Sequence, residues 1–234
     1  MLDLHNIETG YGAGQVLFGV SLTVPAGACV SLMGRNGMGK TTTVRAIMGQ
    51  LPLTGGRISR FGDDHPAQSS FEIARAGIGL VPEGRQIFSN LTVRENLQTF
   101  HRVPAGKTRA IWHFERVLAL FPRLAERLDH AGNHLSGGEQ QMLAIGRALM
   151  TNPKLLILDE ATEGLAPIIR QQIWDCLSQL KEDGQSILII DKNVDAIARL
   201  ADHNYILDKG RVAWHGDSKS LLATADLKSR YLGV

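Results

Sequence analysis

The order of hydrophobic and polar residues predicts a strand-rich start that leads into a helix. Positions 2, 4 and 6 alternate with positions 3, 5 and 7, and the runs Val20–Val24 and Cys29–Met33 are also typical of strands. After Gly34 the pattern changes to helical spacing. The apolar positions that recur at this spacing are Val44, Ile47, Met48 and Leu51. This part of the chain is therefore predicted to run from strands through a glycine loop into a helix.

The middle of the chain is predicted to hold a long helical insert. Arg57–Phe61 and Ile78–Val81 are typical of strands, with a short helix at Phe71–Ala76 between them. From Leu91 to Met150 the β signal almost disappears, and a loop at Val103–Gly106 interrupts the helical spacing. The apolar residues at this spacing are Val93, Leu97, Ile111, Phe114, Val117, Leu118 and Phe121. We expect one domain over residues 1–234, with a helical subdomain of approximately residues 90–150 inserted in its core.

The rest of the chain favours a parallel sheet. LLILD at 155–159 and ILIID at 187–191 are short, continuous apolar runs, the pattern of strands covered on both faces. Ile168–Leu180 between them has helical spacing, which predicts a βαβ crossover. Tyr205–Leu207 and Arg211–Ala213 predict a hairpin ahead of a terminal helix. The fold class is therefore α/β with a mainly parallel sheet.

Composition and charge narrow the classes of function. The 234 residues are 44% hydrophobic and 21% charged, an ordinary globular composition. With 25 Lys and Arg against 23 Asp and Glu, the chain lacks the basic excess of nucleic-acid binders, so no nucleic-acid partner is expected. Cys29 and Cys176 have no metal-binding spacing and are predicted to fill the core of a protein in a reducing cytosol. No window approaches the roughly 18 apolar residues of a membrane span, so we expect a chain that is soluble by itself.

A phosphate-binding loop is predicted at residues 34–41. Their sequence, GRNGMGKT, matches G-x-x-x-x-G-K-[ST] between a strand and a helix. Gly34, Gly37 and Gly39 let backbone N–H groups point at phosphate oxygens, and the helix adds its positive end. Lys40 would reach the β- and γ-phosphates, and the Thr41 hydroxyl would ligate Mg²⁺. The predicted nucleotide-binding segment also contains Arg35, Asn36, Met38 and Thr42.

An acidic pair follows the apolar run at 155–158. Asp159 leaves the C-terminal end of the strand, where ligands of parallel sheets gather, and is the candidate to hold Mg²⁺. Glu160 beside it is the candidate to polarise the attacking water. Taken alone, an apolar run that ends in Asp-Glu is also typical of a strand whose end simply reaches solvent. The combination with a phosphate loop is what favours hydrolysis.

The segment LSGGEQQ at 135–141 opens a helix. Ser136 and Glu139 have the spacing of a capping box, which explains part of this segment. A capping box does not require the two consecutive glycines Gly137 and Gly138. A Ser-Gly-Gly turn ahead of a helix N-terminus is also an anion site, with open backbone and a hydroxyl aimed outward.

The order GRNGMGKT, LSGGEQQ, LLILDE, with the helical insert between the first two, resembles the ATP-binding cassette superfamily over essentially the whole chain. LSGGEQQ matches the signature sequence of that family. The resemblance implies a P-loop NTPase fold of this type, with an N-terminal antiparallel β portion, and it implies ATP and Mg²⁺ as cofactors. It also implies a head-to-tail dimer in which Ser136 and Gly138 act in trans on the nucleotide of the other subunit.

The same resemblance assigns positions outside these motifs. Tyr11, expected upstream of the first strand pair, matches the aromatic residue that stacks on adenine, with Val16 packed beside it. The alternative for a lone tyrosine in a loop is a plain surface position. The segment Glu163–Ala166 matches the loop that crosses the dimer interface in the family, and it is also a strand-to-helix connector ahead of Pro167.

Two positions depart from the usual family pattern. Where most cassettes carry a glutamine that senses Mg²⁺ and water, Glu83 takes the matching place, and a carboxylate still suits a metal. Gln86 is the alternative residue for this role. Where most cassettes carry a histidine that contacts the γ-phosphate, this chain has Lys192. A lysine can contact a phosphate as a point charge or be a solvated residue at a helix start, and both interpretations stay open. His203 is predicted to lie too far along the next helix to substitute, so hydrolysis should depend chiefly on Glu160.

Four segments narrow the resemblance: PEGRQIFSNLTVRENL, EGLAP, NVDAIARLAD and YLGV. Together they resemble one ATPase subunit of the bacterial branched-chain amino-acid importers, and urea and short-amide importers share much of this pattern. The resemblance implies a second ATPase subunit, either the same chain or a paralogue, two transmembrane permease subunits and, indirectly, a solute-binding protein. It implies a peripheral location at the cytoplasmic face of the bacterial inner membrane. A cassette ATPase without a transport role and a binding module without turnover are the alternatives.

Overall fold

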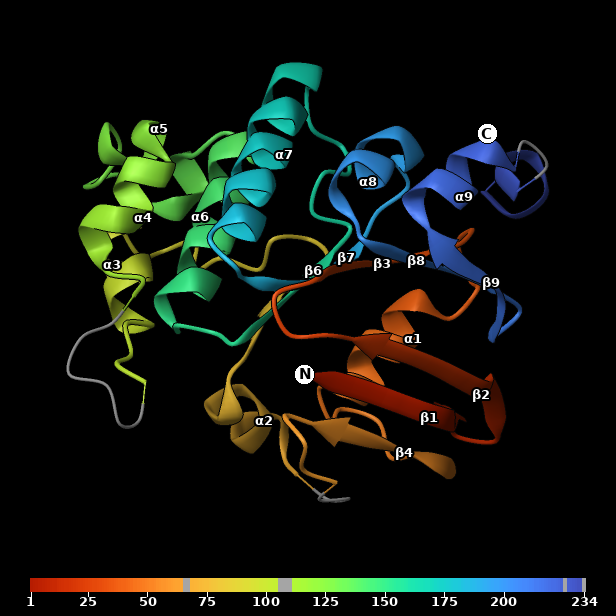
Figure 1. Cartoon of the computed structure of the whole chain (residues 1–234). Helices are drawn as coiled ribbons and strands as arrows, with labels where there is room; N and C mark the ends of the chain where they lie inside the picture. Colours follow the sequence, from red (N-terminus) through yellow and green to blue (C-terminus); the bar gives the residue numbers. More distant parts are fainter. Residues whose placement is uncertain (65–67, 105–110, 225–226, 233–234) are drawn as a thin grey trace.

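The strands of the protein form two sheets in a computed structural model that describes residues 1–64, 68–104, 111–224 and 227–232 (Figure 1). The small antiparallel sheet has the order β2-β1-β4 and consists of β1 (Leu2–Tyr11), β2 (Gly14–Val24) and β4 (Gly55–Arg60). The larger sheet has the order β5-β6-β7-β3-β8-β9. Its strands are β3 (Cys29–Met33), β5 (Ile78–Val81), β6 (Leu155–Asp159), β7 (Ser186–Ile190), β8 (His203–Asp208) and β9 (Arg211–Asp217). Since β9 alone among these described strands pairs antiparallel with its neighbour, the predicted α/β class with a mainly parallel sheet is confirmed.

Helices cover the larger sheet on both faces. The helix α1 (Lys40–Ile47) lies between the two sheets, and α7 (Pro167–Glu182), α8 (Val194–Leu200) and α9 (Ser218–Ala223) lie on the opposite face (Figure 1). The short helix α2 (Ser70–Ala76) precedes β5, and a π-helical turn at Lys228–Leu232 follows α9. Within the described ranges, no helix is both long and apolar enough to span a bilayer.

The predicted helical insert lies between β5 and β6 in the sequence and beside the sheet in space (Figure 1). It consists of α3 (Val93–Thr99), α4 (Phe114–Leu120), α5 (Pro122–Ala125), a 3₁₀ turn at Gly132–His134 and α6 (Gly137–Met150). The expected loop at Val103–Gly106 extends into residues 105–110, which lie outside the described residues. Ile111, expected on an apolar helix face, is 59% exposed and lies in no helix, whereas its neighbour Trp112 is buried.

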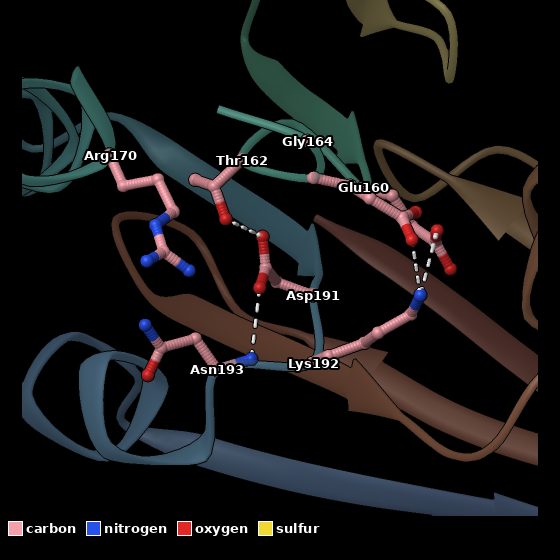
Figure 2. Close-up of a pocket in the computed structure, with 8 residues that line it drawn as sticks. Glu160, Thr162, Gly164, Arg170, Asp191, Lys192 and Asn193 are labelled. Carbon is pink, nitrogen blue, oxygen red and sulfur yellow. Dashed lines mark hydrogen bonds and ion pairs between the residues drawn. The ribbon is translucent and has the colours of Figure 1, made fainter. Parts of the chain in front are cut away.

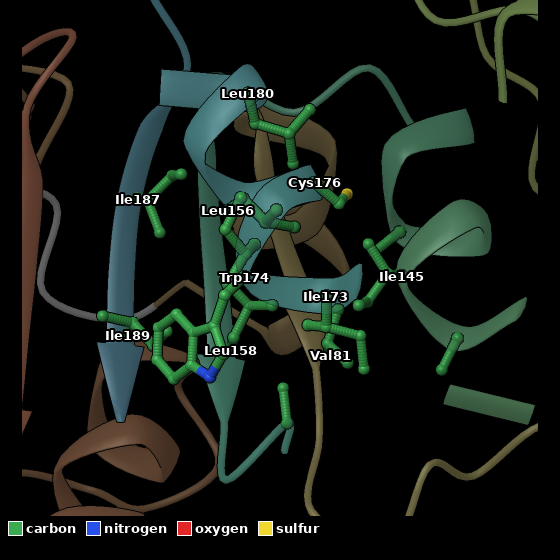
Figure 3. Close-up of a cluster of buried hydrophobic side chains, with 14 of the residues drawn as sticks. Val81, Ile145, Leu156, Leu158, Ile173, Trp174, Cys176, Leu180, Ile187 and Ile189 are labelled. Atoms are coloured by element: carbon green, nitrogen blue, oxygen red, sulfur yellow. The ribbon is translucent and has the colours of Figure 1, made fainter. Parts of the chain in front are cut away.

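Alternate residues of the central strands face two separate hydrophobic clusters. Leu156 and Leu158 of β6 pack with residues of α6 and α7, as Figure 3 shows, whereas Leu155 and Ile157 pack toward α1 and the small sheet. Each of these four side chains is completely buried, and full burial of such a side chain contributes about 1.5–3 kcal/mol. This explains why the run is continuously apolar up to Asp159, where the chain leaves the strand.

The first strand departs from simple alternation at Asn6. A register shift between Leu4 and Ile7 accompanies a left-handed backbone at Asn6, with φ of 46°. As a result Ile7 is buried with Leu2 and Leu4 and Asn6 is exposed, so the predicted alternation of positions 2, 4 and 6 with 3, 5 and 7 ends at this shift. The prediction for His203 is also wrong, because α8 ends at Leu200 and His203 begins β8.

Candidate functional site: a nucleotide phosphate site

The loop between β3 and α1 has the backbone that the phosphate motif requires. Gly34, Gly37 and Gly39 have φ angles of 146°, 79° and 105°, a region that favours glycine. A Cβ atom would lie 2.5 Å from the Leu207 carbonyl oxygen at Gly34 and 2.7 Å from Leu17 Cδ2 at Gly39. The first turn of α1 contains no acidic residue, so its free N–H groups favour an anion.

The remaining loop residues have distinct contacts. The carbonyl oxygen of Arg35 accepts a hydrogen bond from Lys40 Nζ at 3.2 Å, and Asn36 is exposed beside it. Met38 is fixed from the β8–β9 turn, because its Sδ and carbonyl oxygen accept hydrogen bonds from Lys209 N and Gly210 N at 3.2 and 3.1 Å. Thr42 is buried inside α1. The side chains of Arg35 and Asn36 are therefore accessible to a ligand, whereas that of Thr42 is turned away from solvent.

Lys40 extends from this loop toward the acidic pair at the end of β6. Its Nζ lies 3.4 Å from Glu160 Oε1, and the two side chains are only 5% and 10% exposed. The phosphate loop and the predicted water-activating carboxylate are therefore neighbours in space, although 120 positions separate them in sequence.

Asp159 has the properties of a hard-metal ligand. The residue is 3% exposed, and its Oδ1 has no hydrogen-bond partner among the described residues. Burial and the nearby Glu83 raise the pKa of Asp159, whereas a hydrogen bond from the Thr41 side chain opposes this shift. A divalent cation would satisfy the free carboxylate oxygen, and Mg²⁺ prefers oxygen ligands such as those of Asp159 and Thr41. These residues therefore fit the metal that the sequence predicts.

Glu160 is held in an unusual backbone conformation. Its φ is 53°, which is uncommon for a residue other than glycine, and its N–H donates to the Ile190 carbonyl oxygen at 2.8 Å. Burial and a hydrogen bond with the Glu163 side chain raise the pKa of Glu160 to about 7. The side chain is thus poised to take or give a proton near neutral pH.

The loop after β7 brings a second cation to Glu160. Lys192 Nζ lies 4.0 Å from Glu160 Oε2 and forms an ion pair with Glu163 (Figure 2). The hydrogen bond with Glu163 raises the pKa of Lys192, so the side chain is an ammonium ion. Lys192 is half-exposed just ahead of α8, as the alternative of a solvated residue at a helix start describes, and its ammonium group also pairs with two carboxylates.

Glu83 reaches the same acidic cluster. One carboxylate oxygen from each of Glu83, Glu160 and Glu163 lies within 4.8 Å of the others. The alternative residue, Gln86, is turned back on the loop, where its Nε2 donates to the Glu83 carbonyl oxygen at 3.4 Å. Of the two candidates, Glu83 is therefore the one whose side chain lies at the site.

Tyr11 lies elsewhere than expected relative to the strands. It is the last residue of β1 and pairs with Gly14 across the β1–β2 hairpin, so its placement upstream of the first strand pair is wrong. The tyrosine is 44% exposed, and its hydroxyl accepts a hydrogen bond from Arg45 of α1 at 3.0 Å. Val16 lies on β2 and faces the phosphate loop, 3.7 Å from a Cβ built on Gly39. Sequence patterns gave no signal for the Arg45 contact.

The signature segment begins α6 as predicted. Ser136 is the N-cap residue, its hydroxyl accepts from Glu139 N at 3.3 Å, and Glu139 Oε2 accepts from Ser136 N at 2.7 Å. The structure also gives both glycines a packing role. A Cβ on Gly138 would lie 2.7 Å from Ile169 of α7, and one on Gly137 would lie 3.1 Å from the Arg85 guanidinium. No local motif could have indicated these long-range contacts.

The phosphate loop, the buried Asp159 and the adjoining Glu160 define the class of P-loop nucleotide hydrolases. The ABC transporter family model matches residues 17–163. The chain therefore belongs to the ABC transporter family and is an ATPase of that family.

Similar proteins cover nearly the whole chain. The high-affinity branched-chain amino acid transport ATP-binding protein BraG of Pseudomonas aeruginosa is 42% identical over 233 residues, which are 100% of both chains. The Nod factor export ATP-binding protein I of Rhizobium meliloti is 40% identical over 90% of this chain and 62% of its own length. The ADP conformation of an ATP-binding cassette of an ABC transporter has a TM-score of 0.83 at 28% identity, covering 98% of this chain and 97% of that one. A dimeric bacterial ABC transporter cassette has a TM-score of 0.79 at 27% identity, covering 93% and 99%.

Proposed function

We propose that the chain is the ATP-hydrolysing subunit of a bacterial importer for branched-chain, hydrophobic amino acids. The position of Glu160, between the phosphate-loop lysine and the end of β6, is the observation that carries the hydrolytic role. The full-length similarity to BraG supports the solute class.

The residues of the site have separate roles in ATP hydrolysis. The backbone N–H groups of residues 34–39 and of the start of α1 bind the phosphates. The ammonium group of Lys40, which pairs with Glu160 in the absence of nucleotide, then pairs with the phosphate oxygens. Mg²⁺, held by Thr41 and Asp159 with Glu83 nearby, would neutralise phosphate charge. Glu160 orients the attacking water and accepts its proton.

Two further contacts complete the nucleotide site. Tyr11, placed over α1 by its Arg45 contact, stacks on adenine, with Val16 beside the loop. Lys192 contacts the γ-phosphate as a point charge. The outward-facing Ser136 hydroxyl and the Gly138 backbone act on the nucleotide of the second subunit in a head-to-tail dimer, which the dimeric relative supports.

Transport requires partners that convert closure into movement. A second ATPase subunit, the same chain or a paralogue, would close on two ATP molecules, and two permease subunits would receive the motion near Glu83–Leu97. A solute-binding protein would deliver the amino acid from the other side of the membrane, so this chain would work as a peripheral subunit at the cytoplasmic face. ATP drives the movement only because it binds the closed state more strongly than the open state.

Uptake by a reconstituted transporter tests the solute. The chain would be assembled in proteoliposomes with candidate permease subunits and a candidate solute-binding protein, with ATP inside. We expect accumulation of leucine, isoleucine and valine, and none with Lys40→Met. Accumulation of urea or acetamide in place of these amino acids would instead support the short-amide importer.

A further inference from the structure

Two neighbouring loops bound a cavity of about 290 Å³ beside Glu160 (Figure 2). They follow β6 and β7, which are parallel neighbours in the larger sheet, so both loops lie at one edge. The Thr162 hydroxyl donates to Asp191 Oδ2 at 2.5 Å, and the Asn193 N–H donates to Asp191 Oδ1 at 2.9 Å. Because Asp191 is buried, these bonds fix the backbone on both sides of Lys192 to the loop that carries Glu160.

The Lys192 side chain is the solvent-accessible part of this arrangement. Its ammonium lies between two carboxylates, paired with Glu163 and 4.0 Å from Glu160. Lys192 and Glu163 are 47% and 50% exposed, and ion pairs at such exposure add little to stability. Lysine is a point charge on a long flexible stem, so a partner chiefly determines where the charge resides. The pair therefore affects the position of the ammonium more than the stability of the fold.

We propose that Glu163 is a positioning residue that holds the Lys192 ammonium beside Glu160, in reach of the terminal phosphate of ATP, without letting it close onto the Glu160 carboxylate. This inference depends on the proposed function, because it assigns Glu163 a role at the same hydrolytic site. Glu163 also shares a hydrogen bond with Glu160, and the role assigned here is the separate one that it exerts through Lys192.

The charges around Glu160 explain why such a residue is needed. Lys40 already lies 3.4 Å from one oxygen of Glu160, and Lys192 faces the other oxygen. Without Glu163, the Lys192 ammonium would have Glu160 as its nearest anion. A second close cation would occupy the oxygen that orients water and would withdraw Lys192 from the phosphate.

Steady-state ATP hydrolysis by the purified full-length chain tests this role. Glu163→Gln keeps the size of the side chain but removes its charge, and we expect kcat to fall about fivefold with the KM for ATP changed less than about twofold. Glu163→Asp should recover part of the rate. Lys192→Met should also lower kcat, and Glu163→Gln should cause no further loss in that background. Glu182→Gln, an exposed charge at the far end of α7, is the matched control.

Two results would overturn the inference: an unchanged kcat in Glu163→Gln, or the same loss whether or not Lys192 is present. Failure of the proposed function has a different signature, because Glu160→Gln would then continue to release phosphate. Loss of turnover in Glu160→Gln together with normal turnover in Glu163→Gln would contradict only the role of Glu163.

Discussion

Lys40 Nζ lies 3.4 Å from Glu160 Oε1, and both side chains are almost buried. The cation proposed to bind phosphate is thus neutralised by the carboxylate proposed to orient water. Binding of ATP would replace one anionic partner of Lys40 by another and release Glu160 for the water. Occupation of the phosphate site and readiness of the carboxylate are linked through this one contact.

Lys40→Met should therefore abolish nucleotide binding without unfolding the protein. Loss of charge-assisted hydrogen bonds to phosphate is expected to weaken ATP binding by about 100-fold or more. Titration with a fluorescent ATP analogue would measure the change. Lys219→Met, which removes an exposed lysine from α9, serves as the control. Near-normal ATP affinity in the Lys40 variant would argue against the phosphate loop as the binding site.

Ser136→Ala should distinguish the role of Ser136 as the N-cap of α6 from its proposed role at the nucleotide of the second subunit. Ser69 has the same capping box at α2, so Ser69→Ala is a matched control within the chain. Each substitution is expected to cost about 1 kcal/mol of unfolding free energy, measured by urea denaturation. Only Ser136→Ala should also slow ATP turnover in the assembled dimer. Equal turnover in the two variants would leave Ser136 with nothing beyond capping.

Gly146→Ala should destabilise the helical insert despite the higher helix propensity of alanine. A Cβ at Gly146 would lie 2.8 Å from Val117 Cγ1 and 3.2 Å from Leu97 Cδ2. Overpacking costs about 1–3 kcal/mol, whereas the propensity gain is about 1 kcal/mol. In a Val117→Ala background the closer of the two contacts is removed, and Gly146→Ala should cost less stability than in the intact protein. An equal loss in both backgrounds, measured by denaturant unfolding, would rule out this contact as the cause.

The two cysteines predict a loss of stability at alkaline pH. Burial raises the pKa of each thiol from 9.0 to about 12, so the folded protein keeps both protons where the unfolded chain loses them. The protonated thiols contribute fully to the free energy of unfolding below pH 9, and this contribution is lost as the pH rises toward 12. At pH 10 the free energy of unfolding is lowered by roughly 1 kcal/mol per thiol. Between pH 8 and pH 10, the free energy of unfolding should fall less in the double variant Cys29→Ala/Cys176→Ala than in the intact protein. An unchanged pH dependence in that variant would contradict the shift.

Regular elements of the fold were predictable where one physical signal was dominant. The continuous apolar run at 155–158 indicated a strand buried on both faces, and Ser136 with Glu139 indicated the start of α6. The signal failed where the backbone departs from regularity. The left-handed backbone at Asn6 shifts the register of β1, and although asparagine tolerates this conformation, its presence alone does not place a bulge. His203 was misplaced because the end of α8 depends on tertiary packing.

The motifs of the site were predictable from the sequence, whereas the side-chain contacts between distant residues were not. The spacing of the phosphate loop specifies Lys40, and the end of β6 specifies Asp159 and Glu160. The Lys192–Glu163 pair joins residues 29 positions apart. Such a contact depends on the adjacency of β6 and β7 and on side-chain direction, which no local pattern encodes. The same reason hid the packing of Gly138 on Ile169.

We propose that Glu160 is the residue that turns a nucleotide-binding chain into an ATPase. Phosphate release by Glu160→Gln, measured at saturating ATP beside the intact protein and Glu182→Gln, is the most direct test of this role. We predict that the Glu160 variant binds ATP normally and that its release of phosphate falls by about 100-fold or more, while Glu182→Gln is unchanged. Unchanged phosphate release by Glu160→Gln would show that Glu160 is not the residue that activates water.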